Sequence, residues 1–104
     1  MLPKAPSQLC AAKIAEDNVL LTWESVSSDE KTPVEAYVIE AREVGEKDFH
    51  ELAEVNAATL SHAATGLKED TEYEFAVRAK NVAGISEEAA QLEEPVKTRV
   101  HVGG

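Results

Sequence analysis

The chain has 104 residues and carries 20 acidic and 10 basic side chains, which give a formal net charge of −10. This length fits one domain, able to bury roughly two-thirds of its unfolded surface. The negative charge argues against nucleic acid and anionic membranes as partners, because both bind positive protein surfaces. No stretch is long and apolar enough to span a bilayer. We therefore expect a monomeric domain whose partner, if it has one, is a basic protein surface.

The cysteine and asparagine content favours a cytoplasmic, reducing compartment. The single cysteine, Cys10, cannot form an internal disulfide, so the fold depends on its packed core alone. None of the three asparagines is followed two positions later by Ser or Thr, so the sequence has no N-glycosylation acceptor. Residues 1–6 also lack the apolar core of a signal peptide. An extracellular location remains the alternative.

Pro3 and Pro6 mark a polar lead-in, so residues 1–6 are interpreted as a linker. The domain is then expected over 7–100, with 101–104 as a tail or linker. Within it, short segments that are rich in alternating apolar residues alternate with turn residues. The strands expected from this pattern cover 9–14, 19–23, 34–42, 49–55, 60–65, 72–80 and 95–100.

Two acidic segments connect these strands. Residues 25–32 form a polar loop that Pro33 closes. Residues 87–94 are acidic and alanine-rich, with some helical propensity, but we interpret them as an extended approach to the last strand. Their charge would make an edge that repels stray strands.

The strand over 72–80 has the clearest pattern, because Tyr73, Phe75 and Val77 alternate with mostly charged residues. Leu67 lies six residues before Tyr73, across a polar turn. A tyrosine at this spacing can fold over its own corner and hydrogen-bond the backbone of the turn, as in the tyrosine corner of immunoglobulin-like sandwiches. The strand ends in a turn at 81–84, where a glycine can take positive φ.

Seven short strands with turn signals every 8 to 12 residues and no helix of ordinary length predict an all-β fold. We expect a seven-stranded antiparallel immunoglobulin-like β-sandwich. An odd number of passes places the two ends of the domain at opposite poles, roughly 30 Å apart at about 3.3 Å per residue. Such a unit suits end-to-end stringing and can carry tension along its axis.

The run from Trp23 to Glu43 reads WESVSSDEKTPVEAYVIEARE. With the corner from Leu67 to Tyr73, it resembles a fibronectin type III domain in order and spacing over nearly the whole chain. It is more narrowly similar to the type III domains of giant muscle proteins (titin, twitchin and myosin-binding protein C), and the ending EPVKT over 94–98 is similar to their exit strand.

The chain departs from the muscle pattern at six positions: Ser25 and Val26 replace two prolines, Glu30 and Lys31 replace two glycines, His62 replaces an aromatic residue, and Phe49 replaces a tryptophan. The resemblance implies a non-catalytic spacer and scaffold unit of a large intracellular, sarcomeric protein. It also implies protein partners, with myosin or neighbouring immunoglobulin and type III domains as contacts. The alternative is a type III module of an extracellular adhesion protein or receptor.

No residues in the sequence group into a catalytic, cofactor or metal site, although the parent protein could carry a kinase domain elsewhere. Cys10 has no histidine or acidic partner at motif spacing and is interpreted as a core or edge thiol. The histidines at 50, 62 and 101 stand alone, without a neighbouring ligand. Adjacent carboxylates such as Glu87 and Glu88 point to opposite faces of an extended chain and do not form a catalytic pair. The residues expected to build the core are Trp23, Tyr37, Leu67, Tyr73, Phe75 and Val77.

Four residues are candidates for contact with a partner. Val82 and Ile85 are apolar at a hairpin that is usually exposed, so they either pack against the end of the core or form a small contact patch. Arg42 and Arg78 lie on outer faces of neighbouring strands, where pairing with Glu40 and Glu74 across the strands would explain them without a ligand.

Overall fold

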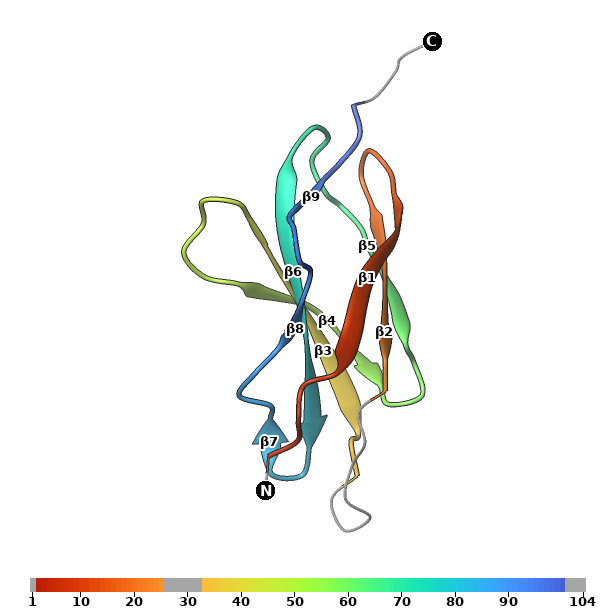
Figure 1. The fold of residues 1–104 in the computed structure, drawn as a ribbon, viewed down its shortest axis with the longest axis vertical. Coiled ribbons are helices and arrows are strands. Elements are labelled where there is room, and N and C mark those ends of the chain that lie inside the picture. Colours follow the sequence, from red (N-terminus) through yellow and green to blue (C-terminus); the bar gives the residue numbers. More distant parts are fainter. Residues whose placement is uncertain (1, 26–32, 101–104) are drawn as a thin grey trace.

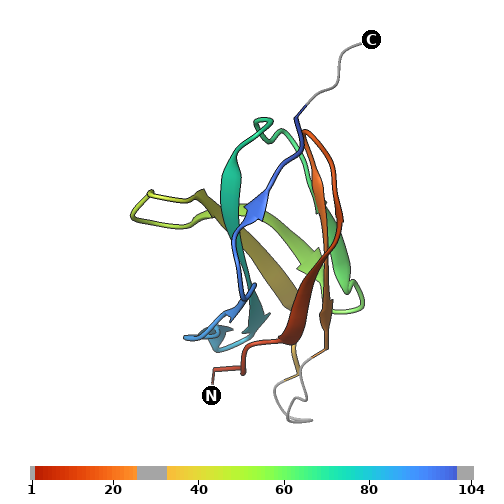
Figure 2. The same cartoon turned by 45° about the horizontal axis from the view of Figure 1, so that its top comes forward.

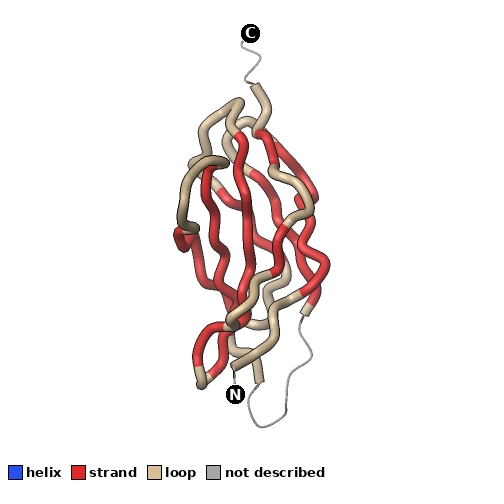
Figure 3. The backbone as a smooth tube through the Cα atoms, turned by 60° about the vertical axis from the view of Figure 1, so that its left-hand side comes forward, coloured by secondary structure: helices blue, strands red, loops and turns tan. Residues whose placement is uncertain are grey.

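The computed structural model of the chain describes residues 2–25 and 33–100, which form strands and loops but no helix (Figure 3). Apart from Ser25, the predicted acidic loop over 25–32 lies outside the described residues, as do the predicted tail and His101. No helix among the described residues could cross a bilayer.

The first sheet is antiparallel and has the strand order β1-β2-β5. Its strands are β1 (Ser7–Ile14), β2 (Val19–Glu24) and β5 (Ser61–Ala64). The alternation predicted for β2 is confirmed, because Val19, Leu21 and Trp23 are 0%, 0% and 4% exposed. Leu60 differs from the expectation: it precedes β5 and is 39% exposed, although its carbonyl oxygen still accepts a hydrogen bond of 3.1 Å from the N–H of Trp23 on β2.

The second sheet has the order β4-β3-β6 and continues into a last strand that is broken into three pieces, each antiparallel to β6. Its long strands are β3 (Ala36–Glu43), β4 (His50–Asn56) and β6 (Glu72–Asn81). The three pieces are β7 (Gly84–Ile85), β8 (Ala90–Gln91) and β9 (Val96–Lys97). The last strand expected over 95–100 is therefore shorter than predicted, and the approach over 87–94 contributes a piece of its own.

The two sheets pack face to face (Figures 1 and 2) and enclose one apolar core. Its aromatic members come in two pairs: the rings of Trp23 and Tyr37 meet edge to face at 5.7 Å, and those of Tyr73 and Phe75 stack at 6.1 Å. Such pairs add to the stabilisation that burial of the rings already supplies. If the three pieces beside β6 are counted as one interrupted strand, the described chain has seven strands, and the predicted all-β sandwich is confirmed.

The turn predicted after β6 is confirmed. Val82 and Ala83 connect β6 to β7, and Gly84 takes φ = +137°, which favours glycine. A Cβ at Gly84 would also lie 3.1 Å from Cδ2 of Leu2, so the lead-in passes close to this hairpin. The first and last described residues lie at opposite ends of the sandwich (Figure 1). The end that holds Leu2 and the β6–β7 turn is called the N-terminal pole below.

Candidate functional site

The chemically reactive side chains of the described residues are scattered. Cys10 is exposed on β1, an edge strand. His50 lies on β4 and His62 on β5, so the two histidines belong to different sheets. Within 2–25 and 33–100, no three His, Cys, Asp or Glu side chains come together as a metal site requires.

The hydroxyl of Tyr73 holds the turn before β6. It accepts a hydrogen bond of 2.8 Å from the backbone N–H of Lys68, and Leu67 packs against the core beside it. This is the geometry expected of a tyrosine corner. Asp70 in the same turn has φ = +51°, a left-handed conformation that only a minority of non-glycine residues adopt. The corner therefore fixes a backbone that carries local strain.

Thr98 anchors the end of the chain to this corner, and the sequence did not indicate it. The side chain is 2% exposed. Its hydroxyl donates to the carbonyl oxygen of Lys68 at 2.6 Å and accepts from the backbone N–H of Thr71 at 3.0 Å. The sequence gives little indication of this role, because a threonine near the end of a strand is common.

Ser86 likewise binds backbone groups through its hydroxyl, at the first break of the last strand, between β7 and β8. The side chain is 2% exposed, and its hydroxyl donates to the carbonyl oxygen of Glu88 at 2.7 Å. It also accepts from the backbone N–H of Ala79 at 3.2 Å. Buried backbone groups that find no ladder partner must be satisfied in another way. The serine hydroxyl supplies that partner where β7 has ended and β8 has not begun.

The outer face of the second sheet carries the two candidate arginines, and both are engaged there. Arg42 Nε lies 3.1 Å from Glu74 Oε1, and Arg78 Nε lies 2.9 Å from Glu40 Oε1. The guanidinium of Arg42 also lies 4.3 Å from the centroid of the Phe49 ring. The pairing predicted between the strands is therefore present.

The same face hides two apolar side chains that the alternating pattern assigned to the outside. Val38 and Ala76 are 2% and 1% exposed. A third ion pair of 3.1 Å, between Lys80 on β6 and Glu54 on β4, spans the intervening β3. Long charged side chains can bury apolar surface beneath their stems while their charged ends meet. The three ion pairs thus lie over a thin second apolar layer.

The other two candidates, Val82 and Ile85, are brought together at the N-terminal pole. Their side chains are 78% and 42% exposed, so they do not pack into the end of the core. Leu2, 40% exposed, lies beside the same hairpin. Three large exposed apolar side chains thus lie at the N-terminal pole on or beside one hairpin, and they are here called the apolar pole residues (Leu2, Val82, Ile85). Arg42 and Arg78 are not among them.

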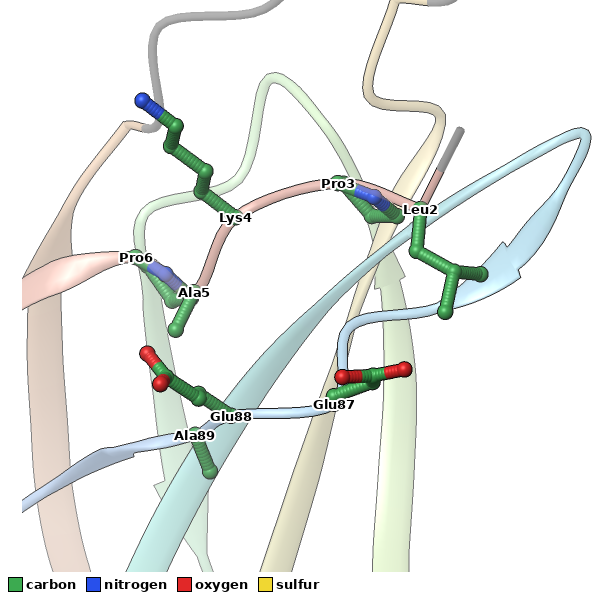
Figure 4. A pocket seen from close by; sticks show the side chains of 8 residues that line it. All are labelled: Leu2, Pro3, Lys4, Ala5, Pro6, Glu87, Glu88 and Ala89. Carbon is green, nitrogen blue, oxygen red and sulfur yellow. The ribbon is translucent and has the colours of Figure 1, made fainter.

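A shallow groove of about 880 Å³ begins next to these residues (Figure 4). One wall is the lead-in from Leu2 to Pro6, and the other is the segment from Glu87 to Ala89. Figure 4 shows Ala5 and Pro6 facing the second wall, while the amine of Lys4 points away from both carboxylates. The sequence could not indicate this groove, because its walls lie more than 80 residues apart in the chain.

Comparison with known proteins agrees with this geometry. Residues 4–95 match the family described as fibronectin type III domain. Roundabout homolog 1 of Mus musculus is 34% identical over 99 residues, which cover 95% of this chain and 6% of that protein. The titin homolog of Caenorhabditis elegans is 32% identical over 85 residues, which cover 82% of this chain and a share of that protein that rounds to 0%.

Among solved structures, the twitchin kinase region from C. elegans superposes on 95% of this chain and 17% of its own, with a TM-score of 0.85 and 25% identity. The chain spans only a small part of each of these proteins, and they include both muscle proteins and a Roundabout homolog. The predicted resemblance to the type III domains of giant muscle proteins is confirmed by the titin homolog and the twitchin structure. The chain belongs to the fibronectin type III domain family.

Proposed function

We propose that the chain is a non-catalytic spacer and scaffold unit of a large multidomain intracellular protein of the titin and twitchin kind. The observation that carries this proposal is the path of the chain, which enters the sandwich at one pole and leaves at the other (Figure 1). A domain of this form adds its long dimension to a string of domains. Force applied at its two ends runs along the strands.

The apolar pole residues (Leu2, Val82, Ile85) are proposed to contact a neighbouring immunoglobulin or type III domain, or another protein of the filament such as myosin. Exposed apolar clusters of this kind mark interaction sites more often than they serve the isolated domain. Arg42 and Arg78 are proposed to act within the domain, because their charges are already matched by Glu74 and Glu40.

The intracellular compartment is supported by Cys10, which is free and exposed. An exposed thiol persists most readily where the surroundings are reducing. One observation favours a second candidate, an extracellular adhesion or receptor module: the 34% identity to Roundabout homolog 1.

The spacer proposal is tested on a three-domain fragment of the full-length protein, which holds this domain and one neighbour on each side. The shape of the fragment is measured by small-angle X-ray scattering. An extended fragment, with the three domains in line, is expected. In the double variant Val82→Ser/Ile85→Ser, the angle at the N-terminal pole should become variable. Val44→Ser, at a residue that is 47% exposed in the β3–β4 connection, is the matched control and should change nothing. A folded-back fragment would overturn the proposal.

The compartment is tested with a membrane-impermeant maleimide on cells that express the full-length protein. Labelling of Cys10 only after permeabilisation supports the intracellular proposal. Labelling on intact cells supports the receptor alternative, and a Cys10→Ser variant identifies the labelled site.

A further inference from the structure

One side of the sandwich is left partly open. There, β1 at the edge of the first sheet runs beside the interrupted last strand of the second sheet (Figures 1 and 2). The two are joined at the far pole by Arg99, whose backbone N–H donates to Ala15 O at 3.0 Å and whose Nε donates to Ile14 O at 2.9 Å. Closer to the N-terminal pole β1 forms its ladder with β2 only. The hydrogen bonds of Arg99 therefore close this side of the sandwich at the far pole, and the side is open toward the N-terminal pole.

The open part forms a groove along both strands. Its first section is the 880 Å³ hollow between 2–6 and 87–89, and its second, of about 560 Å³, lies between 8–11 and 91–93. Pro6 and Leu9 are buried, and Leu92 is half-buried. We call the two sections together the β1–β8 groove (2–11 and 87–93). It offers an apolar floor beside β1, an edge strand whose ladder partner is β2 alone, and such an edge is a template for another strand.

Carboxylates line one wall of this groove. Glu87, Glu88 and Glu93 are exposed on the segment that carries β8. The ion pairs found within 2–25 and 33–100 use other carboxylates, those of Glu40, Glu43, Glu54, Asp70 and Glu74. The wall is therefore negative, and those pairs do not neutralise it.

The opposite wall has an irregular backbone. Gln8 takes φ = +57° inside β1, and the register with β2 shifts between Ser7 and Cys10. Bulges of this kind bend an edge strand and recur beside functional sites. Here Gln8 itself lines the second section of the groove.

We propose that the β1–β8 groove binds an extended protein segment in which basic and apolar side chains alternate. The segment adds its backbone to the free edge of β1, as in other strand-addition complexes. Its apolar side chains enter the groove, since alternate residues of a strand point to one face. Its basic side chains reach Glu87, Glu88 and Glu93.

The negative charge of the groove wall favours a basic protein segment over a nucleic acid or a second copy of this chain. A nucleic acid or a second copy of this chain would bring negative charge to a negative wall, because the chain itself has a net charge of −10. The inference goes beyond the proposed spacer function, and it does not depend on the compartment of the parent protein.

The probe is a capped nine-residue peptide of alternating lysine and valine, titrated into ¹⁵N-labelled domain and followed by NMR. Shift changes should cluster at the backbone amides of 8–11 and 89–93, and the affinity should fall as salt rises. The double variant Glu87→Gln/Glu88→Gln should weaken binding about three- to tenfold, the sum of two exposed ion pairs. Glu51→Gln/Glu72→Gln changes the charge equally at exposed sites away from the groove and should weaken binding less than about twofold.

Three outcomes would overturn the proposal. Equal losses in both double variants would mean that the peptide responds only to overall charge. Unchanged binding of a peptide with proline at its centre would exclude strand addition, because proline lacks the N–H that the ladder needs. Concentration-dependent line broadening of the domain alone, centred on the groove, would mean that a second copy occupies it.

Discussion

At the scale of single residues, three hydroxyl groups hold the backbone at places where the strand ladder is missing. Tyr73 serves the turn before β6, Thr98 ties the end of the chain to that turn, and Ser86 fills the first break of the last strand. Each bond satisfies a backbone N–H that would otherwise stay unpaired. Losing such a partner costs the full desolvation of the orphaned group, which exceeds the modest gain of an average hydrogen bond.

Tyr73→Phe should lower the free energy of unfolding by about 1–3 kcal/mol, because the N–H of Lys68 loses its acceptor while the ring remains. Urea denaturation measures the loss. Hydrogen exchange at Lys68 should quicken, while the amide of Leu67, bonded to Asp17 O, serves as the internal control. An unchanged stability would refute the corner.

Thr98 allows a matched pair of substitutions. Thr98→Val keeps the shape but removes the acceptor of the Thr71 N–H, and should cost about 1–3 kcal/mol of unfolding free energy. Thr98→Ser keeps the hydroxyl and should cost less. If Thr98→Val is as stable as the unsubstituted domain in thermal or chemical denaturation while Thr98→Ser is not, the methyl packing matters and the hydrogen bonds do not.

Trp23 is the largest side chain of the core and lies 4% exposed at the middle strand of the first sheet. Trp23→Ala should cost about 3–5 kcal/mol through the cavity that it leaves. Trp23→Phe should cost clearly less, because the buried Nε1 has no hydrogen-bond partner in the part of the chain that the structure describes. A loss below about 1 kcal/mol for Trp23→Ala, measured by urea denaturation, would contradict the core assignment.

At the scale of elements, the ion pairs of the described residues are of two kinds: those on the outer face of the second sheet and those at its margins. The side chains of Arg78 and Glu40 are 29% and 20% exposed, and the pair covers buried apolar surface. Lys68 and Glu43 are 73% and 36% exposed at 3.5 Å. Exposed pairs of the second kind contribute close to nothing, since water and salt screen them.

A double-mutant cycle should separate the two kinds. Arg78→Met with Glu40→Gln should give a coupling energy of about 0.5–1 kcal/mol, as cross-strand pairs do. Lys68→Met with Glu43→Gln should give a coupling near zero. Equal couplings in the two cycles, from chemical denaturation at low salt, would show that partial burial does not strengthen the first pair.

The long strands could be predicted from the sequence, because apolar and polar residues alternate along a strand that buries only one of its faces. β2 and β6 are examples, with Val19, Leu21, Phe75 and Val77 all essentially buried. β9 lies within the strand predicted over 95–100, but the pieces β7 and β8 could not be predicted, because two residues carry no period. Their pairing depends on β6 and on the hydroxyl of Ser86, which only the folded chain brings together.

Prediction of the candidate site from the sequence was limited in the same way, because some of its features depend on contacts that only the folded chain makes. Val82 and Ile85 could be singled out, since apolar residues in a hairpin are visible in the sequence, and both are exposed. The groove could not, because it depends on how far β1 stands from the segment over 87–93. Leu2 could not be added to the apolar pole residues either, since its contact with the β6–β7 hairpin joins the two ends of the domain.

At the scale of the whole molecule, the two ends of the sandwich and its charge distribution define what the domain can do. The ends leave at opposite poles (Figure 1), so the domain lengthens any string in which it stands. The arginines on the outer face of the second sheet are paired within the domain, while carboxylates line the β1–β8 groove. This arrangement supports the proposed spacer and the proposed binding of an extended segment in the groove.

The central claim, that the domain is a tension-bearing unit closed by one core, is tested most directly by stretching a tandem polyprotein of identical copies in an atomic force microscope. We predict a regular sawtooth with one peak per domain and a gain in contour length on the order of 300 Å per peak, as nearly the whole folded chain is released at once. Extension without peaks, or peaks that release only a fraction of that length, would contradict the claim.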